Sequence, residues 1–176
     1  MRIFSMYKSL YLCYNKYVRM VNVKGSGKNK RAMVYSVADY CIKKLMPRLE
    51  DKLDIEITLI PRLKEKEHTA GDCIWEDDTC IRPRAFSIRV DSTQGLQAML
   101  ETVCHELVHV KQYARGELKD LARSNICCKW KGKKINYDHQ NYYDHPWEIE
   151  AHGRERGLFL RWFVESKWKK CRWVDY

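Results

Sequence analysis

The stretch from Thr93 to Ala114 repeats apolar residues every three or four positions, which is the spacing of one face of an α-helix. The apolar residues of this stripe are Leu96, Met99, Leu100, Val103, Leu107, Val110 and Ala114. Ser92 or Thr93 is suited to cap the start of such a helix, and Gly116 is suited to end it. A helix of this kind gains most of its stability from packing, so the stripe predicts a folded domain built around it.

The rest of the chain predicts an α+β fold around this helix. We expect helices at residues 32–53 and 146–168, strands at 54–63, 71–75 and 85–90, and a hairpin at 127–137. Pro47 is expected to kink or divide the first of these helices, and Pro146 suits the first turn of the last one. Gly132 marks the turn of the hairpin. Because there is no internal repeat and no long linker, we expect one α+β domain.

Basic residues are concentrated at the start of the chain, which carries a formal net charge of +10. The basic residues of this segment are Arg2, Lys8, Lys16, Arg19, Lys24, Lys28, Lys30 and Arg31, and no acidic residue precedes Asp39. That leaves 25 of the 33 basic residues against all 23 acidic residues in the rest of the chain. We therefore divide the chain into a basic N-terminal arm, residues 1–31, and a nearly neutral domain, residues 32–176. Such an arm is suited to contact nucleic-acid phosphates or acidic surfaces.

The composition excludes several classes of protein. The chain is 45% hydrophobic and 12% aromatic, which is too rich in core-forming residues for a disordered protein. Charged residues interrupt the longer apolar stretches, so we expect neither a membrane span nor a cleavable signal. The eight cysteines include no Cys-x-x-Cys pair, which argues against a zinc ribbon. Without a secretion signal they indicate a reducing compartment, so we expect a cytoplasmic protein with mostly buried thiols.

His105, Glu106 and His109 stand within the predicted helix 93–114 in the pattern His-Glu-x-x-His. Residues four positions apart share a helical face, so both imidazoles can reach one metal ion. Imidazole and carboxylate ligands in an open site favour Zn²⁺. Glu106 lies beside that ion and can take a proton from a zinc-bound water, whose pKa the metal lowers to about 7. The pattern therefore predicts one catalytic zinc ion, with Glu106 as the general base for peptide hydrolysis.

A catalytic zinc ion needs a third protein ligand. The extended pattern with a downstream Gly and His is absent, and the remaining candidates are His139, His145, Glu148 and Glu150. Glu148 falls on the same stripe of the last predicted helix as Phe159 and Trp162, which must face inward. Glu150 falls on a separate charged stripe, which is typical of a solvent-exposed face. Glu148 is therefore the expected third ligand, with Glu150 as the alternative and His145 after both.

Further side chains are candidates for contacts at the site. His152 and Glu155 continue the inward stripe of Glu148, and His152 can orient a ligand or bind a tetrahedral oxyanion. Tyr142 and Tyr143 immediately precede the last helix and can bind the oxyanion as well. We therefore add His152 and Tyr143 to Glu106 as candidate catalytic residues. Each residue also has a purely structural alternative. Tyr142 or Tyr143 can be a buried tyrosine whose hydroxyl is hydrogen-bonded, and Glu148 can be an exposed carboxylate that the helix dipole favours in the first turn.

Two motifs together resemble a known group of enzymes. They are His-Glu-Leu-Val-His-Val-Lys-Gln-Tyr-Ala-Arg-Gly-Glu-Leu (105–118) and Pro-Trp-Glu-Ile-Glu-Ala-His-Gly-Arg-Glu (146–155), and between them lies a short hairpin with Trp130 and Gly132. This combination resembles small phage-encoded metallopeptidases, which are minimal zincins of the gluzincin type and are often loosely called SprT-like. The resemblance covers residues 32–165.

The resemblance implies a minimal zincin-like domain, in which a small mixed sheet packs on an active-site helix and a second helix carries the third ligand. In gluzincins this ligand is a Glu, commonly in the pattern Glu-x-x-Ala-Asp, which residues 148–152 match with His152 in place of the Asp. The edge strand of the sheet is expected to hold an extended substrate by strand addition, beside the hairpin 127–137. The third His and the zinc ribbon of the SprT-like proteases proper are not evident.

We therefore expect a zinc-dependent endopeptidase that acts on a protein or peptide substrate in the cytoplasm. If the chain is phage-encoded, this is the cytoplasm of the host cell. No residue separates general proteolysis from the cleavage of one regulatory partner. The alternative is a nucleic-acid-associated protein with a structural or vestigial zinc site. It rests on the basic arm and on the lysines around Trp130, namely Lys129, Lys131, Lys133 and Lys134.

Overall fold

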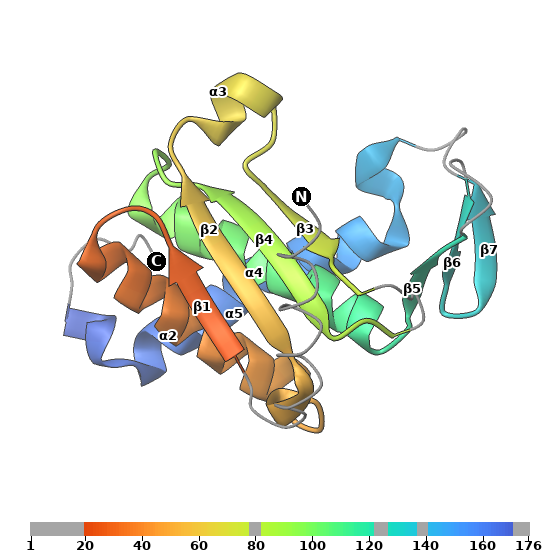
Figure 1. Ribbon diagram of the computed structural model, residues 1–176, viewed down its shortest axis with the longest axis horizontal. Helices are drawn as coiled ribbons and strands as arrows, with labels where there is room; N and C mark the ends of the chain where they lie inside the picture. The colour runs from red at the N-terminus through yellow and green to blue at the C-terminus, as the bar shows by residue number, and fades with distance from the viewer. Residues whose placement is uncertain (1–19, 78–81, 122–126, 137–140, 171–176) are drawn as a thin grey trace, which may run out of the picture.

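A computed structural model describes residues 20–77, 82–121, 127–136 and 141–170. The architecture is α+β, as expected, with a four-stranded sheet, a separate three-stranded sheet and three helices of 18 to 20 residues (Figure 1). The long helices gather on one side of the larger sheet, and the smaller sheet lies at one end of the molecule.

The larger sheet is mixed. Its strands lie in the order β1 (Met20–Lys24), β2 (Asp54–Ile60), β4 (Ala85–Asp91) and β3 (Gly71–Trp75). The first three are parallel to one another, and β3 runs antiparallel to β4 at the edge of the sheet. Every second residue of β2 and β4 is buried, including Ile57 and Ile88, so these strands present one apolar face to the helices.

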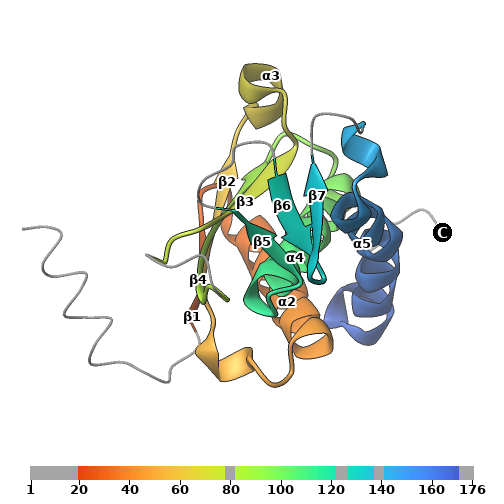
Figure 2. The ribbon, with the colours of Figure 1, turned by 90° about the vertical axis from the view of Figure 1, so that its right-hand side faces the viewer.

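The helices form two layers on that face. α2 (Lys28–Leu45) and α4 (Leu96–Ala114) pack on the sheet, and α5 (Pro146–Glu165) packs on their far side (Figure 2). Val37, Val103 and Phe159, from the three helices, are fully buried in one continuous core. The amphipathic stripe predicted over 93–114 is thus confirmed. It explains why α4, the most buried helix, can also carry polar groups deep in the molecule.

The smaller sheet follows α4. β5 (Leu118–Asp120), β6 (Cys127–Trp130) and β7 (Lys133–Asn136) pair antiparallel in chain order. Lys131 and Gly132 both have a positive φ, of 46° and 87°, which is the geometry of a two-residue type I′ turn. The hairpin is thus confirmed up to Asn136, and Tyr137 lies outside the described residues. The sequence did not predict β5, because three residues are too few for an alternating pattern to stand out.

Gly116 ends α4 as predicted. It has a φ of 69°, its N–H donates to the carbonyl of Tyr113, and the N–H of Glu117 donates to the carbonyl of Gln112. This pair of hydrogen bonds is a Schellman motif, for which glycine is the favoured residue. The predicted cap at the other end is wrong. Gly95 is the N-cap and no side chain caps the helix, because Thr93 instead bonds to the carboxylate of Asp91.

Part of the segment assigned to the basic arm belongs to the fold. β1 pairs with β2, and α2 begins at Lys28, so residues 20–31 lie inside the domain. Lys24 forms an ion pair with Glu56 on the neighbouring strand. The strand escaped prediction because only Val21 and Val23 alternate within a run of basic and polar residues. Residues 1–19 lie outside the described part of the chain.

The other predicted boundaries shift by several residues. α2 ends at Leu45, two residues before Pro47, and a short 3₁₀ turn over Glu50–Lys52 follows. β2 ends at Ile60 because the chain turns into the short helix α3 (Leu63–Glu67). α5 ends at Glu165, before a 3₁₀ turn over Lys167–Lys170.

Two expectations from composition can be checked on the described residues. None of their helices is long and apolar enough to cross a membrane. Cys41, Cys104, Cys127 and Cys128 are buried thiols that form no disulfide among the described residues, and Cys73 is a partly buried one. The cysteines of the described part therefore behave as small core residues, as expected.

Candidate metal centre

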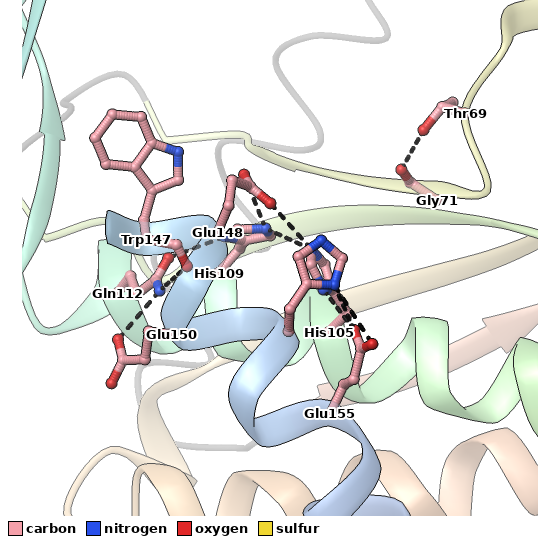
Figure 3. Close-up of polar contacts among 10 residues, drawn as sticks. Thr69, Gly71, His105, His109, Gln112, Trp147, Glu148, Glu150 and Glu155 are labelled. Atoms are coloured by element: carbon pink, nitrogen blue, oxygen red, sulfur yellow. Dashed lines mark hydrogen bonds and ion pairs between the residues drawn. The ribbon is translucent and has the colours of Figure 1, made fainter. Parts of the chain in front are cut away.

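His105, His109 and Glu148 come together where α4 faces α5 (Figure 3). The two Nε2 atoms of His105 and His109 are 3.0 Å apart. The carboxylate oxygens of Glu148 lie 3.4 Å from His105 Nε2 and 3.5 Å from His109 Nε2. All three side chains are buried, with relative exposures of 8%, 9% and 3%. The predicted third ligand, Glu148, is therefore the carboxylate that joins the two histidines.

These separations fit a metal ion. In a tetrahedral site with bonds of about 2.0–2.1 Å, the ligand atoms lie about 3.4 Å from one another. One carboxylate oxygen of Glu148, Oε2, is buried and has no hydrogen-bond partner among the described residues. A buried oxygen of this kind is unfavourable unless a cation or a donor satisfies it. Two imidazoles and one carboxylate can therefore hold a metal ion here and leave a position for water or a substrate.

Local structure explains how each of the three side chains reaches the cluster. His105 and His109 are one turn apart on α4, so their rings project from the same face. Pro146 is the first residue of α5, which places Glu148 in the first turn. The helix dipole favours a carboxylate there. Ala151 is fully buried one turn further along, and its small side chain allows α5 to approach α4 closely.

The outer ring nitrogens of both histidines are held by acceptors. His105 Nδ1 lies 2.8 Å from Glu155 Oε2, and His109 Nδ1 lies 2.9 Å from Gln112 Oε1 (Figure 3). Because a carboxylate and an amide oxygen accept hydrogen bonds, each Nδ1 carries the proton and each Nε2 presents a lone pair to the cluster. Contacts of this kind fix the orientation of metal-binding histidines in proteins.

The amide of Gln112 also connects the two helices. Its nitrogen donates to the backbone carbonyl of Trp147, at 2.9 Å, and to Glu150 Oε2, at 3.1 Å. These two bonds identify the nitrogen and leave the amide oxygen to accept from His109. Gln112 is fully buried. One side chain thus sets the orientation of His109 and holds the residue that precedes Glu148.

Glu150, the alternative third ligand, lies in a separate network. Its carboxylate forms ion pairs with the buried Lys111, at 2.7 Å, and with Arg154, at 3.1 Å. Lys111 Nζ also pairs with Glu117 at 2.6 Å. Against the effect of burial, Lys111 and Gln112 lower the pKa of Glu150. Within the described residues Glu150 does not join the cluster of metal-binding atoms.

Glu106 is buried beside the cluster and beneath the edge strand β3. Only 5% of it is exposed, and this burial raises the pKa of its carboxyl to about 7, although the neighbouring His109 and His105 act in the opposite direction. A Cβ atom at Gly71 of β3 would lie 3.1 Å from Glu106 Oε1. The carboxylate therefore sits against a point of β3 where there is no side chain.

The cluster attracts positive charge. Burial opposes protonation of His105, but its contacts with the carboxylates of Glu148 and Glu155 outweigh this effect and raise its pKa to about 9. In the same way, the two histidines lower the pKa of Glu148 despite its burial. A proton is one cation that such a group retains, and a divalent metal ion is another.

His152 and Tyr143, the other predicted catalytic residues, lie at the outer side of the cluster. The ring of His152 is 4.5 Å from the ring of His105, and His152 Nδ1 is 3.3 Å from Glu155 Oε2. Tyr143 is 66% exposed, and its ring lies 5.8 Å from that of His152. Tyr143 and His152 thus contact each other. Among the described residues, His152 also contacts a histidine of the cluster, whereas Tyr143 does not.

The remaining candidates have different surroundings. Tyr142 is 53% exposed, and the partial burial of its hydroxyl together with the negative charge of Glu148 raises the pKa of that hydroxyl. His145 stacks on the ring of Trp147 at a centroid distance of 4.5 Å and precedes the first turn of α5. His139 lies outside the described residues.

Sequence reasoning did not assign a role to Gln112 or Glu155. The signals were present, because Glu155 lies on the inward stripe of Glu148, and Gln112 follows His109 by three positions on the same helical face. What the pattern could not show is which ring nitrogen each residue contacts. That depends on the distance and rotation between α4 and α5.

We predict that Glu155→Ala weakens zinc binding by about 10- to 100-fold, because His105 loses the acceptor that holds its ring. The matched control is Glu165→Ala on the same helix, whose carboxylate pairs with Lys44 and Tyr40 away from the cluster. The measurement is competition with a chromophoric chelator on each purified variant. Equal affinities for the two variants would contradict an orienting role for Glu155.

Comparison of the chain with protein-family models, with curated proteins and with solved structures finds no match in any of the three. What the protein does must therefore be inferred from its own residues and their geometry.

Proposed function

We propose that the protein is a zinc-dependent peptidase, in which His105, His109 and Glu148 bind the ion and Glu106 is the general base. The observation that carries the proposal is the buried cluster, with ligand atoms 3.0 to 3.5 Å apart and a second buried carboxylate adjoining it. Two imidazoles, a carboxylate and a separate base are the groups that metal-assisted hydrolysis requires.

The residues divide the chemistry between them. A zinc ion bound by the three ligands supplies a Lewis acid that polarises a carbonyl and lowers the pKa of water to about 7. Glu106 accepts a proton from the water as its oxygen attacks the peptide carbonyl, and then donates that proton to the nitrogen of the departing amine. The raised pKa of Glu106, about 7, suits a group that must both accept and donate near neutral pH.

The choice of zinc rests on the whole motif. Two histidines and a carboxylate also occur in Fe(II) sites, so the donor set alone does not select the metal. The spacing His-Glu-x-x-His on one helix, with a buried Glu next to the first ligand, favours hydrolysis at a zinc site. Elemental analysis of the purified protein separates the two metals directly.

The edge strand β3 offers a place for an extended peptide. At both ends of the pairing between β3 and β4, the β3-side residue that forms the backbone hydrogen bond has an even number. Because hydrogen-bonded residues alternate along an antiparallel strand, the backbone groups of Asp72 and Ile74 also bond to β4. The N–H and C=O groups of Cys73 and Trp75 therefore point to the free edge. A substrate strand that adds to this edge runs past Gly71, under which Glu106 lies.

The contacts favour Tyr142 over Tyr143 for stabilising the oxyanion that forms during attack on the carbonyl. Tyr142 interacts with the ligand Glu148, whereas Tyr143 packs on His152. His152 keeps a candidate role, since it lies against His105 and shares Glu155 with it. A hydroxyl or imidazole donor aimed at the developing charge is the group that this step needs.

The arrangement supports the zincin-like, gluzincin-type interpretation of the sequence. A mixed sheet with an antiparallel edge strand, a helix with two histidines and a second helix with a Glu ligand occur together. Glu155, one turn beyond His152 and two turns beyond Glu148, contacts His105 and supplies the carboxylate that the gluzincin Asp would provide. We propose that the substrate is a protein or peptide in the cytoplasm of the cell that makes the enzyme.

We predict that Glu148→Ala abolishes stoichiometric zinc binding, whereas Glu150→Ala retains it, because only Glu148 reaches both histidines. Both variants remove one carboxylate from the same turn of α5, so each controls for the other. The measurement is elemental analysis after zinc loading and desalting. Loss of the metal in Glu150→Ala with retention in Glu148→Ala would reverse the ligand assignment.

We predict that Glu106→Gln retains zinc but lowers the cleavage rate by about 10²- to 10⁴-fold, because the amide cannot accept the proton. The measurement is mass spectrometry of a peptide library digested with the zinc-loaded wild type or variant, which also reveals the bond preference. Cleavage by Glu106→Gln at the wild-type rate would rule out this mechanism. A wild type that binds zinc but cleaves nothing would favour a structural or vestigial metal site.

We predict that Gly71→Ala lowers cleavage by about 10²-fold while zinc stays bound. The new Cβ would lie 2.7 Å from Thr102 Cγ2, 3.0 Å from the backbone oxygen of Arg89 and 3.1 Å from Glu106 Oε1, so it crowds the base and strand β4 and none of the three metal-binding side chains. Gly95→Ala is the matched control, because nothing lies within 4 Å of a Cβ there. Steady-state kinetics on a cleaved peptide, with zinc content measured in parallel, test this. Equal cleavage rates for the two variants would show that the position of Glu106 does not depend on β3.

A further inference from the structure

Three lysines form a straight row across the smaller sheet. Lys119 of β5 is directly opposite Lys129 of β6, which is directly opposite Lys134 of β7. Neighbouring strands are about 4.8 Å apart, and opposite residues point to the same face of a sheet. Three ammonium groups therefore line one face of the sheet at the end of the molecule shown at the right of Figure 1.

The described residues give this row no counter-charge. Like charges in directly opposite positions destabilise a sheet, so such an arrangement needs an explanation. Within the described part of the chain, none of the three lysines forms an ion pair or a side-chain hydrogen bond. Lys129 and Lys134 are exposed, and Lys119 is partly so. Asp120, on β5, pairs in register with Cys128 and so belongs to the opposite face.

One further cation, Arg82, extends the row at its β5 end. A Cβ atom at Gly116 would lie 3.0 Å from Lys119 Cε and 3.2 Å from Arg82 Cγ, so these two side chains converge over the glycine. Lys131 lies in the turn between β6 and β7, where its N–H bonds to the carbonyl of Glu117 and its ammonium group is 4.7 Å from the ring centroid of Trp130, on the opposite face from the row. The positive strip thus runs from the loop before β4 across all three strands.

The partner that suits this strip carries regularly repeated negative charge. The exposed large apolar residues of the described part are Tyr35, Ile74, Tyr142, Tyr143, Ile149 and Val164, none of which belongs to this sheet. Protein partners and membrane surfaces are usually held by such apolar anchors as well as by charge. A nucleic-acid backbone needs no apolar anchor, because its phosphates alone supply most of the non-specific binding energy.

We propose that the lysine row Lys119–Lys129–Lys134 is a docking surface for the phosphate backbone of a nucleic acid. Binding is independent of base sequence, because lysine ammonium groups recognise phosphate oxygens and do not read base edges from a flat sheet. The inference does not rest on the proposed peptidase activity. It predicts the same affinity for the wild type and for Glu106→Gln.

The test compares two triple variants of the full chain with equal changes in charge. Lys119→Gln/Lys129→Gln/Lys134→Gln removes the row. Lys52→Gln/Lys64→Gln/Lys66→Gln removes three exposed lysines elsewhere. Binding is measured by fluorescence anisotropy with a labelled single-stranded DNA of about 20 nucleotides, which exceeds the roughly 4–16 nucleotides that one single-strand-binding fold covers. The salt concentration is varied at constant pH, and thermal unfolding of each variant verifies its fold.

We expect the row variant to bind at least about tenfold more weakly, with a salt slope lower by about 2, because each phosphate contact to a single strand contributes roughly 0.7. The control variant keeps the wild-type affinity, and Lys119→Arg/Lys129→Arg/Lys134→Arg restores binding. An equal loss in both Gln variants overturns the proposal in favour of net charge. Absent or salt-insensitive binding by the wild type also overturns it. Displacement of DNA by polyglutamate at equal charge concentration identifies an acidic polypeptide as the partner and overturns it as well.

Discussion

The structure depends on the contact between α4 and α5, where a polar cluster is buried inside an apolar core. His105, Glu106, His109 and Glu148 are each 9% exposed or less. Buried ionisable groups destabilise a fold unless they are paired, hydrogen-bonded or bound to a metal. Each of these groups therefore favours a partner close by, and a cation in the cluster would satisfy Glu148 Oε2, which has no hydrogen-bond partner among the described residues. This requirement explains why so many polar side chains converge on one short stretch of the interface.

The partners form a chain that crosses the interface repeatedly. Gln112 bridges His109 on its own helix to Trp147 and Glu150 on the other. Glu155 reaches back from α5 to His105. Because each bond joins the two helices or orients a ring at their contact, a change in their relative position would break several bonds together. A site built this way is rigid before any ligand binds, which favours a fixed metal geometry.

Much of the framework could be predicted from periodicity. The apolar stripe of α4, the end of that helix at Gly116 and the inward placement of Glu148 all follow from spacing along the chain. The failures occurred where the local signal was short or ambiguous. β1 and β5 have too few alternating residues to be recognised, and both form because a neighbouring strand offers its backbone groups. The predicted cap at Ser92 or Thr93 failed because Asp91 binds Thr93 instead.

The sequence by itself determined which residues can bind a metal ion, because two histidines one turn apart share a helical face in any α-helix. It also favoured an inward position for Glu148, since that residue shares the apolar stripe of α5. Only the tertiary structure decided which side chains contact these three residues, and which lysines line up across the smaller sheet. Both depend on how separate elements pack and pair. The rotation of α5 against α4 selects Gln112 and Glu155, and the register of three strands aligns lysines that lie far apart in the chain.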